Sequence, residues 1–553
     1  MWKRNRDDAF PDRFLHAAVV APERAAVVLD GELLNYGDLA DEAVLVARGL
    51  VARGVAPGDA VGVLAPTSRC FLVSLLGAAL AGVRVVPINT RFRRRELSFV
   101  IAKAELSVLI TTSLLDAGLD LVALLHSALP DLKDHQHDQA DFATAPQLRA
   151  VVGMGMADLP GIMSGDRFYR DAESVDPQVV RDRFEQVSRD DVAVVSFTSG
   201  TTSNPKGCLI RHGSMVEMWD ASAARLGIRE RDVCWIPSPM FHAAGYGGVG
   251  VLAGVKGTVL TQSHFQPAEA ARLMAEHRPR IWYSPFPPVT DAVVEAAPAA
   301  GYDLGTVEAA VYVAQTPERF DWLSAKLSNA GIVQPYGLTE STLFVTLGDP
   351  AEAYDVRKSG TGQVFHRVEM RLIDPETGSE ANLGDFGEIQ FRGFNAFIGY
   401  LSEPELTAAT LLDGGWVRTG DLGRINEFGQ LQCVGRLKDM LKVGGENVSA
   451  LEVEAHLQTH PAIKLAQVVA APDERLQEVP CAYVELEAGH DLTADDVVAH
   501  CTGEIARYKI PRYVRFVDSW PMSTTKIRKA ELRGWIAAEV AEQGEDVALA
   551  REQ

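Results

Sequence analysis

The sequence predicts an α/β protein with a large N-terminal domain of parallel-sheet α/β subdomains, a small β subdomain and a small α+β C-terminal domain. Through much of the first 435 residues, short β-branched runs alternate with helical stretches, the pattern of a parallel sheet covered by helices. From residue 355 to 435, short strands are separated by turn sequences such as DPETG and NEFG, which favours antiparallel pairing. We therefore place one domain at residues 1–435 and a second at 436–553.

The N-terminal elements follow from local periodicity. Residues 17–54 predict a strand pair followed by an amphipathic helix, and residues 59–66, 83–89 and 106–112 predict short apolar strands. The most apolar run, residues 71–83, has only 13 residues, so it is too short to cross a bilayer and predicts a buried helix.

Composition limits the partners and the compartment. The net charge is −21, which argues against a general attraction to nucleic acid or to an anionic membrane. The six cysteines show no CxxC spacing, which argues against a zinc site and a disulfide framework and fits a reducing compartment. The basic N-terminus lacks a following apolar segment, so we expect no signal peptide and a soluble, cytoplasmic protein.

The segment SFTSGTTSNPKG, residues 196–207, has the composition of an anion-binding loop. It follows a strand at 191–197 and precedes a helix at 214–227, whose start Ser214 and Glu217 mark as a capping box. Its glycines allow close backbone approach, its hydroxyls donate hydrogen bonds, and Lys206 supplies a positive charge. It is not a Walker A loop, because Pro205 stands where the second glycine should be. These residues alone leave a polyphosphate site and an ordinary solvated loop open.

Further segments decide between these alternatives. In order along the chain, the sequence resembles the adenylate-forming superfamily, in its acyl- and aryl-CoA synthetase branch, at FTSGTTSNPKG, QPYGLTEST (334–342), GWVRTGDLG (415–423), GRLKDMLKVGGENVSALEVE (435–454) and MSTTKIRKAELR (522–533). VVPINTRFRRREL (85–97) is also similar to this family, so the resemblance runs over nearly the whole chain.

The resemblance implies a two-step reaction. A carboxylate attacks the α-phosphate of ATP with loss of pyrophosphate, and coenzyme A then takes the acyl group with release of AMP. Glu340 would bind Mg²⁺, a hard cation that prefers carboxylate oxygen. The alternative is that Glu340 is only a solvent-exposed carboxylate at the start of a helix. The nucleotide would be held by Thr198, Ser199, Gly200, Thr201, Thr202, Lys206, Tyr336, Gly337, Thr339, Asp421, Arg436 and Lys526. For Asp421 and Arg436, the alternative is an ion pair that joins the two domains.

The resemblance also assigns the catalytic and mobile parts. Lys526 would enter the site from the small domain and bridge the carboxylate and the α-phosphate, while its neighbour Lys529 is expected to be solvated. The C-terminal domain would rotate about a hinge at Lys438, and Gly444 and Gly445 would line the coenzyme A tunnel, unless they form an ordinary glycine turn. The catalytic set is Lys526, Thr202, Glu340 and His242.

The acyl pocket would come from two walls. Its predicted residues are His242, Gly245, Tyr246, Val313, Ala314, Gln315, Gly337 and Leu338. His242 would gate the pocket or border the thiol path, and Gly245 would leave room for a ring. The alternative is that His242 and Tyr246 are plain structural residues. Because Val313–Gln315 replace a small-residue segment common in relatives, we expect an aryl or medium-size acid and not a long straight chain.

Two functional alternatives remain open at this point. Ser203 and Thr525 replace glycines usual in the family, and the 313–315 wall is unusual. An enzyme with the same adenylation step could therefore use a carrier-protein thiol, an amine or a nitrite-type oxyanion. A catalytically dead nucleotide-binding protein would be expected to lack Glu340 or Lys526, and both are present. For the oligomeric state, we keep a homodimer as an open alternative.

Overall fold

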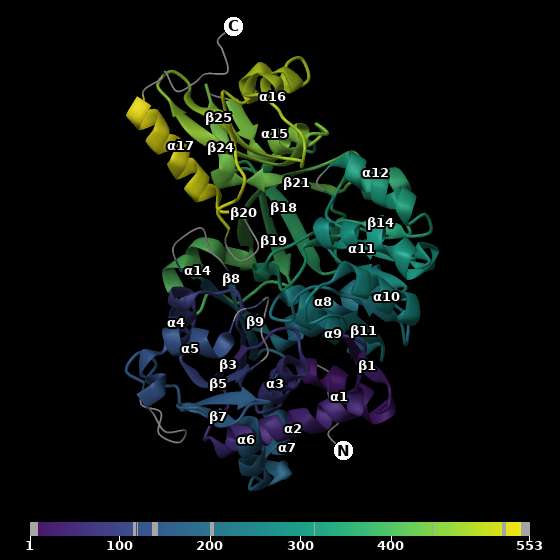
Figure 1. The fold of residues 1–553 in the computed structure, drawn as a ribbon, viewed down its shortest axis with the longest axis vertical. Helices are drawn as coiled ribbons and strands as arrows, with labels where there is room; N and C mark the ends of the chain where they lie inside the picture. The colour runs from purple at the N-terminus through teal and green to yellow at the C-terminus, as the bar shows by residue number, and fades with distance from the viewer. Residues whose placement is uncertain are drawn as a thin grey trace. The chain divides into compact units, whose positions relative to one another are not determined.

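The computed structural model describes residues 9–113, 118, 120–134, 142–198, 204–314, 316–444, 446–522 and 527–543. Two compact units make up the chain (Figure 1). The first contains Met1–Ala314, Asp321–Met370 and Phe391–Val417, and the second contains Gln315–Phe320, Arg371–Gln390 and Arg418–Gln553. The predicted domain boundary at residues 435/436 stays a prediction.

A seven-stranded sheet holds the strand that leads into the anion-binding loop. Its order is β7-β6-β5-β3-β4-β8-β9, parallel throughout except for the antiparallel pair β8 and β9. The strands are β3 (Ala60–Leu64), β4 (Arg84–Pro87), β5 (Leu106–Thr112), β6 (Ala150–Met154), β7 (Ile162–Ser164), β8 (Val192–Thr198) and β9 (Lys206–Arg211). The helices of this stretch are α2 (Tyr36–Ala52), α3 (Arg69–Leu80), α4 (Arg94–Lys103), α5 (Leu121–Ala128), α6 (Gly165–Glu173) and α7 (Pro177–Gln186).

A second seven-stranded sheet has the order β14-β13-β12-β10-β11-β1-β2, parallel except for β1 and β2. Its strands are β1 (Ala25–Leu29), β2 (Glu32–Asn35), β10 (Val233–Trp235), β11 (Thr258–Thr261), β12 (Ile281–Tyr283), β13 (Ala309–Val311) and β14 (Gly331–Val333). The remaining helices up to residue 326 are α1 (Phe10–Val20), α8 (His212–Arg225), α9 (Ala243–Gly254), α10 (Pro267–His277), α11 (Pro287–Ala300) and α12 (Pro317–Lys326). The predicted parallel-sheet architecture of the N-terminal part is confirmed.

Smaller sheets follow along the chain. One has three short antiparallel strands, β15 (Pro335–Tyr336), β16 (Thr346–Leu347) and β17 (Gln363–Val364). Helix α13 (Tyr354–Ser359) lies between β16 and β17, and α14 (Pro404–Thr410) comes later in the chain. The next has the order β18-β19-β20-β21, with β18 (Val368–Ile373), β19 (Gly387–Gly393), β20 (Val417–Ile425) and β21 (Leu431–Arg436). This is the predicted β subdomain.

The C-terminal part is α+β, as predicted. Its sheet has the order β23-β22-β25-β24, and β26 pairs with β25. The elements are β22 (Met440–Val443), β23 (Glu446–Ser449), α15 (Ala450–Leu457), β24 (Ile463–Asp473), β25 (Gln477–Leu486), α16 (Ala494–Cys501), β26 (Tyr513–Phe516) and α17 (Lys529–Gln543).

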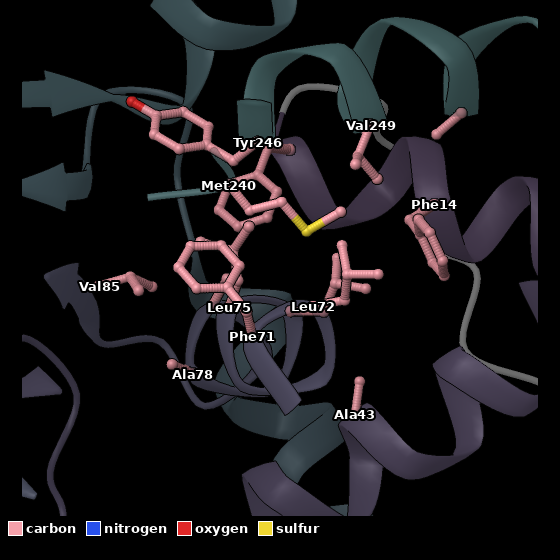
Figure 2. Close-up of a cluster of buried hydrophobic side chains, with 14 of the residues drawn as sticks. Phe14, Ala43, Phe71, Leu72, Leu75, Ala78, Val85, Met240, Tyr246 and Val249 are labelled. Carbon is pink, nitrogen blue, oxygen red and sulfur yellow. The ribbon is translucent and has the colours of Figure 1, made fainter. Parts of the chain in front are cut away.

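The core of the first unit is built around α3, the helix predicted to be buried. In Figure 2, Phe71, Leu72 and Leu75 from this helix lie among apolar side chains that include Met240 and Val249. Because these side chains are almost completely buried, each contributes about 1.5–3 kcal/mol of hydrophobic stabilisation.

Glycine sets how closely α2 and α3 pack. A Cβ atom on Gly77 would lie 2.6 Å from the carbonyl oxygen of Ala43.

Within the described part of the chain, no helix is both long and apolar enough to cross a bilayer.

Candidate active site

The predicted phosphate loop connects two strands. β8 and β9 form an antiparallel hairpin in which Thr198 lies opposite Lys206. The prediction that a helix follows this loop is wrong: β9 intervenes, and α8 begins at His212. The predicted Ser214–Glu217 capping box is not formed either, because Ser214 lies inside α8, and the Glu217 carboxylate pairs with Arg189 and Arg367. The loop residues named for phosphate binding, Ser199, Gly200, Thr201 and Thr202, lie outside the described residues, as does Ser203.

A segment from much later in the chain completes this hairpin. The backbone of residues 398–401 pairs with β9, through Cys208 opposite Tyr400 and through the Leu401 N–H, which donates to the Gly207 carbonyl at 2.8 Å. The ammonium of Lys206 lies 5.6 Å from the centre of the Tyr400 ring. At the end of the hairpin, Lys206 therefore lies over the ring of Tyr400, a residue from a much later segment of the chain.

Glu340 lies beside the same tyrosine. The Tyr400 hydroxyl donates to Glu340 Oε1 at 2.7 Å, and the Phe397 N–H donates to the Glu340 carbonyl at 2.9 Å. Glu340 belongs to a short 3₁₀ turn, Thr339–Ser341, and its side chain is partly exposed. The structure thus brings Lys206 and Glu340 to one residue, Tyr400, which the sequence analysis missed because no charge or spacing marks it.

Two buried groups that can lose a proton, Cys208 and Tyr246, belong to the same unit as Glu340. Burial raises the pKa of the Cys208 thiol well above its usual value, and the nearby Glu340 carboxylate raises it further. Burial likewise raises the pKa of Tyr246. Tyr246 also packs its ring against the apolar cluster of Figure 2, so its aromatic part belongs to the core.

The segment before Glu340 is shaped by tight backbone contacts. Tyr336 is buried in β15, opposite Thr346 of β16. A Cβ atom on Gly337 would lie 2.0 Å from the carbonyl oxygen of Leu343, so only glycine fits there. Because of this close return of the chain, Leu338, Thr339 and Glu340 follow Tyr336 in one compact turn.

In the first predicted wall of the acyl pocket, His242 and Gly245 both lie in close contact with neighbouring residues. His242 directly precedes α9, with its ring 4.7 Å from that of Phe241. A Cβ atom on Gly245 would lie 2.2 Å from the Pro239 carbonyl oxygen, so packing already accounts for this glycine. Its predicted role in leaving room for a ring stays a prediction.

The second predicted wall includes a residue that the sequence analysis did not name. Val313 is exposed, and the Ala314 N–H donates to Gln334 Oε1 at 3.1 Å. Gln334 is buried and also donates from Nε2 to the Lys358 and Gly360 carbonyls at 3.4 Å each. Gln334 therefore fixes the backbone at Ala314. Gln315 lies outside the described residues.

Asp421 and Arg436 face each other on β20 and β21. Arg436 Nε lies 3.3 Å from Asp421 Oδ1, and the Asp421 side chain is 11% exposed against 47% for Arg436. The ion pair considered as an alternative does exist, but it lies within one sheet. Burial and the adjacent Asp421 raise the pKa of Cys433 to about 12. A carboxylate such as that of Asp421 can accept hydrogen bonds from two hydroxyl groups.

The predicted hinge residue and one of the two predicted tunnel glycines lie at turns. Lys438 lies in the 3₁₀ turn Leu437–Asp439 that directly follows β21. Gly444 has φ +59°, and its N–H donates to the Leu476 carbonyl at 2.9 Å, so a left-handed turn accounts for one glycine of this pair. Gly445 lies outside the described residues.

The C-terminal lysine motif is described only at its flanks. Lys526 and Thr525 lie outside the described residues, between Met522 and Ile527, which pair with each other in an antiparallel bridge. The expectation that Lys529 is solvated is wrong. Its ammonium pairs with the carboxylate of Glu454, whose side chain is only 3% exposed. The partner lies 75 residues earlier, so local sequence gives no signal of this pair.

The donors suit a magnesium ion that ATP brings with it. Among the described residues, no group of three or more histidine, cysteine or acidic side chains could hold a metal by itself. Mg²⁺ commonly takes one or two carboxylates together with phosphate oxygens and water. The single, partly exposed Glu340 carboxylate fits such a site.

Comparison with known proteins identifies the class. The AMP-binding enzyme family matches residues 14–401, and the AMP-binding enzyme C-terminal domain matches residues 452–527. The mitochondrial medium-chain acyl-CoA ligase ACSF2 of Macaca fascicularis is 29% identical over 524 residues, covering 93% of this chain and 84% of that protein.

Solved structures share the fold. ATP-bound MatB from Rhodopseudomonas palustris is 25% identical, with a TM-score of 0.79, and the match covers 95% of this chain and 98% of that one. The anthranilate CoA ligase AuaEII, in complex with anthranoyl-AMP, is 23% identical, with a TM-score of 0.82, covering 96% and 98%.

The chain belongs to the family of AMP-binding enzymes. The predicted resemblance to adenylate-forming enzymes and the prediction of an AMP-forming acid–CoA ligase are confirmed.

Proposed function

We propose that this enzyme activates an aryl or medium-size carboxylic acid with ATP and Mg²⁺, and then transfers the acyl group to coenzyme A. The observation that carries the nucleotide site is the meeting of Lys206 and Glu340 at Tyr400, at the end of the β8–β9 hairpin. A cation and a carboxylate so placed suit a triphosphate with its metal. A cytoplasmic location remains part of the proposal, and a homodimer stays an open alternative.

The roles of the chain's residues follow from charge. Lys206 would bind the β- and γ-phosphates with the loop residues, and Thr339 would donate to the α-phosphate. Glu340 would hold Mg²⁺, which when bound neutralises charge on the phosphate oxygens. Asp421 would accept the two ribose hydroxyls, with Arg436 contacting the ribose or phosphate. Negative charge spreads over phosphate oxygens during such a transfer, so positioning and electrostatic stabilisation supply the catalysis.

The acid class rests on two observations. The segment Val313–Gln315 replaces the small residues common in relatives, and ACSF2, similar over nearly the whole chain, is named for medium-chain acids. The unusual sequence of this segment also supports the second candidate, adenylation with a carrier-protein thiol, an amine or a nitrite-type oxyanion as partner.

One substrate screen separates these functions. ATP–pyrophosphate exchange is measured over aryl, short aliphatic, medium-chain and amino acids, followed by thioester detection with coenzyme A. We expect exchange and thioester with an aryl or medium-size acid. Exchange without thioester supports the second candidate, and no exchange with any acid supports a nucleotide-binding protein that has lost catalysis.

Lys438 should act as a hinge in the second half-reaction. We expect Lys438→Pro to keep adenylation near the wild-type rate and to slow thioester formation, because proline fixes φ and restricts the preceding residue. Lys438→Ala removes the side chain but keeps backbone freedom, and should retain both steps. Single-turnover measurements of each step test this, and equal damage to both steps in Lys438→Pro would refute the hinge.

A further inference from the structure

We propose that Tyr400 is a positioning residue that orients the Glu340 carboxylate toward the magnesium ion of ATP. This inference rests on the proposed role of Glu340. It assigns a task to a side chain that belongs to none of the predicted site residues.

The hydrogen bond fixes one oxygen of the carboxylate. The Tyr400 hydroxyl donates to Glu340 Oε1 at 2.7 Å, the short distance typical of a bond to a charged acceptor. A free carboxylate at the end of two methylene groups turns readily, whereas Mg²⁺ demands near-ideal octahedral geometry. Holding Oε1 removes the rotation that metal binding would otherwise have to stop.

The tyrosine itself has little freedom to move. It is 7% exposed, and its ring makes an edge contact with that of Phe397 at 4.9 Å. Its N–H donates to the Thr407 hydroxyl at 2.9 Å. A rigid donor is what a positioning role requires.

The same segment holds the glutamate by its backbone. The Phe397 N–H donates to the Glu340 carbonyl, and the backbone of residues 398–401 pairs with β9. The Tyr400 ring also carries the Lys206 ammonium at 5.6 Å from its centre, within range of a cation–π contact. Tyr400 thus holds the Glu340 carboxylate through its hydroxyl and contacts the Lys206 ammonium through its ring.

Tyr400→Phe isolates the hydroxyl, because the ring and its contact with Lys206 remain. Titration calorimetry measures ATP binding with Mg²⁺ and with a chelator. In the wild type, Mg²⁺ should strengthen ATP binding. We expect that gain to shrink by about tenfold in Tyr400→Phe, on the scale of a lost hydrogen bond to a charged group, with unchanged metal-free ATP binding. The Mg²⁺ concentration for half-maximal pyrophosphate exchange should rise to the same degree.

Two controls make the result specific. Tyr354 donates its hydroxyl to Asp321 on an exposed surface, so Tyr354→Phe removes a matched tyrosine–carboxylate bond and should leave the Mg²⁺ gain unchanged. In a Glu340→Gln background, adding Tyr400→Phe should lower the Mg²⁺ gain no further, because the two residues act as a unit.

The outcomes decide the inference separately from the proposed function. A Mg²⁺ gain in Tyr400→Phe equal to that of the wild type overturns the inference, and so does an equal loss of metal-free ATP binding. If the wild type exchanges pyrophosphate with no acid, the proposed function fails, while the calorimetric comparison still decides what Tyr400 does.

Discussion

Replacing Lys526 with alanine is expected to slow adenylate formation by about 10²–10⁴-fold, on the scale of other preorganised electrostatic groups. A fixed cation between the acid and the α-phosphate stabilises charge that develops only in the transition state. If Lys526 has the proposed role, the second step does not need it, so thioester formation from supplied acyl-adenylate should proceed at the wild-type rate. ATP–pyrophosphate exchange and single-turnover thioester formation measure the two steps.

The matched control for this variant is another lysine of the same unit. Lys464 is exposed on β24, outside every predicted site segment, so Lys464→Ala should retain both steps. Normal pyrophosphate exchange in Lys526→Ala would remove this residue from the adenylation step.

Replacing Lys529 with methionine is expected to cost about 3–5 kcal/mol in local stability, as for other buried pairs that lose one partner. The Glu454 carboxylate would then be buried without its cation, keeping the Val468 N–H, which donates to Oε1 at 2.6 Å. Hydrogen exchange of the α15 amides measures the free energy of local opening, which is the suitable quantity in a chain of two compact units.

This cost should depend on pH. Burial raises the pKa of Glu454 above its usual value, and Lys529 opposes that shift. Without Lys529 the pKa rises further in the folded state, so the folded variant takes up a proton more readily than the unfolded one. The penalty should therefore be smallest at low pH and grow as the pH rises through the folded-state pKa.

The double variant Glu454→Gln/Lys529→Met is the control. It replaces both charges by neutral groups of similar size and should recover most of the lost stability. A stability of Lys529→Met equal to that of the wild type, at both low and high pH, would show that the pair contributes nothing to the fold.

Local patterns predicted the elements whose burial is continuous. The strands β3, β4 and β5 and the helix α3 are mostly apolar and mostly buried, so neighbouring residues suffice to reveal them. Motif order then predicted the family, because each motif carries residue types that phosphate or ribose chemistry needs.

The errors lie where a distant partner decides the structure. β9 reads as the end of a loop, and its outer edge is paired with residues 398–401, almost two hundred positions later. Glu217 has the spacing of a helix cap, but Arg189 and Arg367 from other parts of the chain take its carboxylate. Lys529 looked solvated for the same reason. Tyr400 could not be selected at all, since its role depends entirely on what surrounds it.

The buried Cys208 thiol has a consequence for the fate of the activated acid. An acyl-adenylate reacts with thiolates, and the thiolate is the nucleophilic form of cysteine. Burial and Glu340 keep the pKa of Cys208 well above its usual value, so this sulfur stays protonated at neutral pH. A buried, protonated thiol is a poor nucleophile, so Cys208 is not expected to compete with coenzyme A for the activated acyl group.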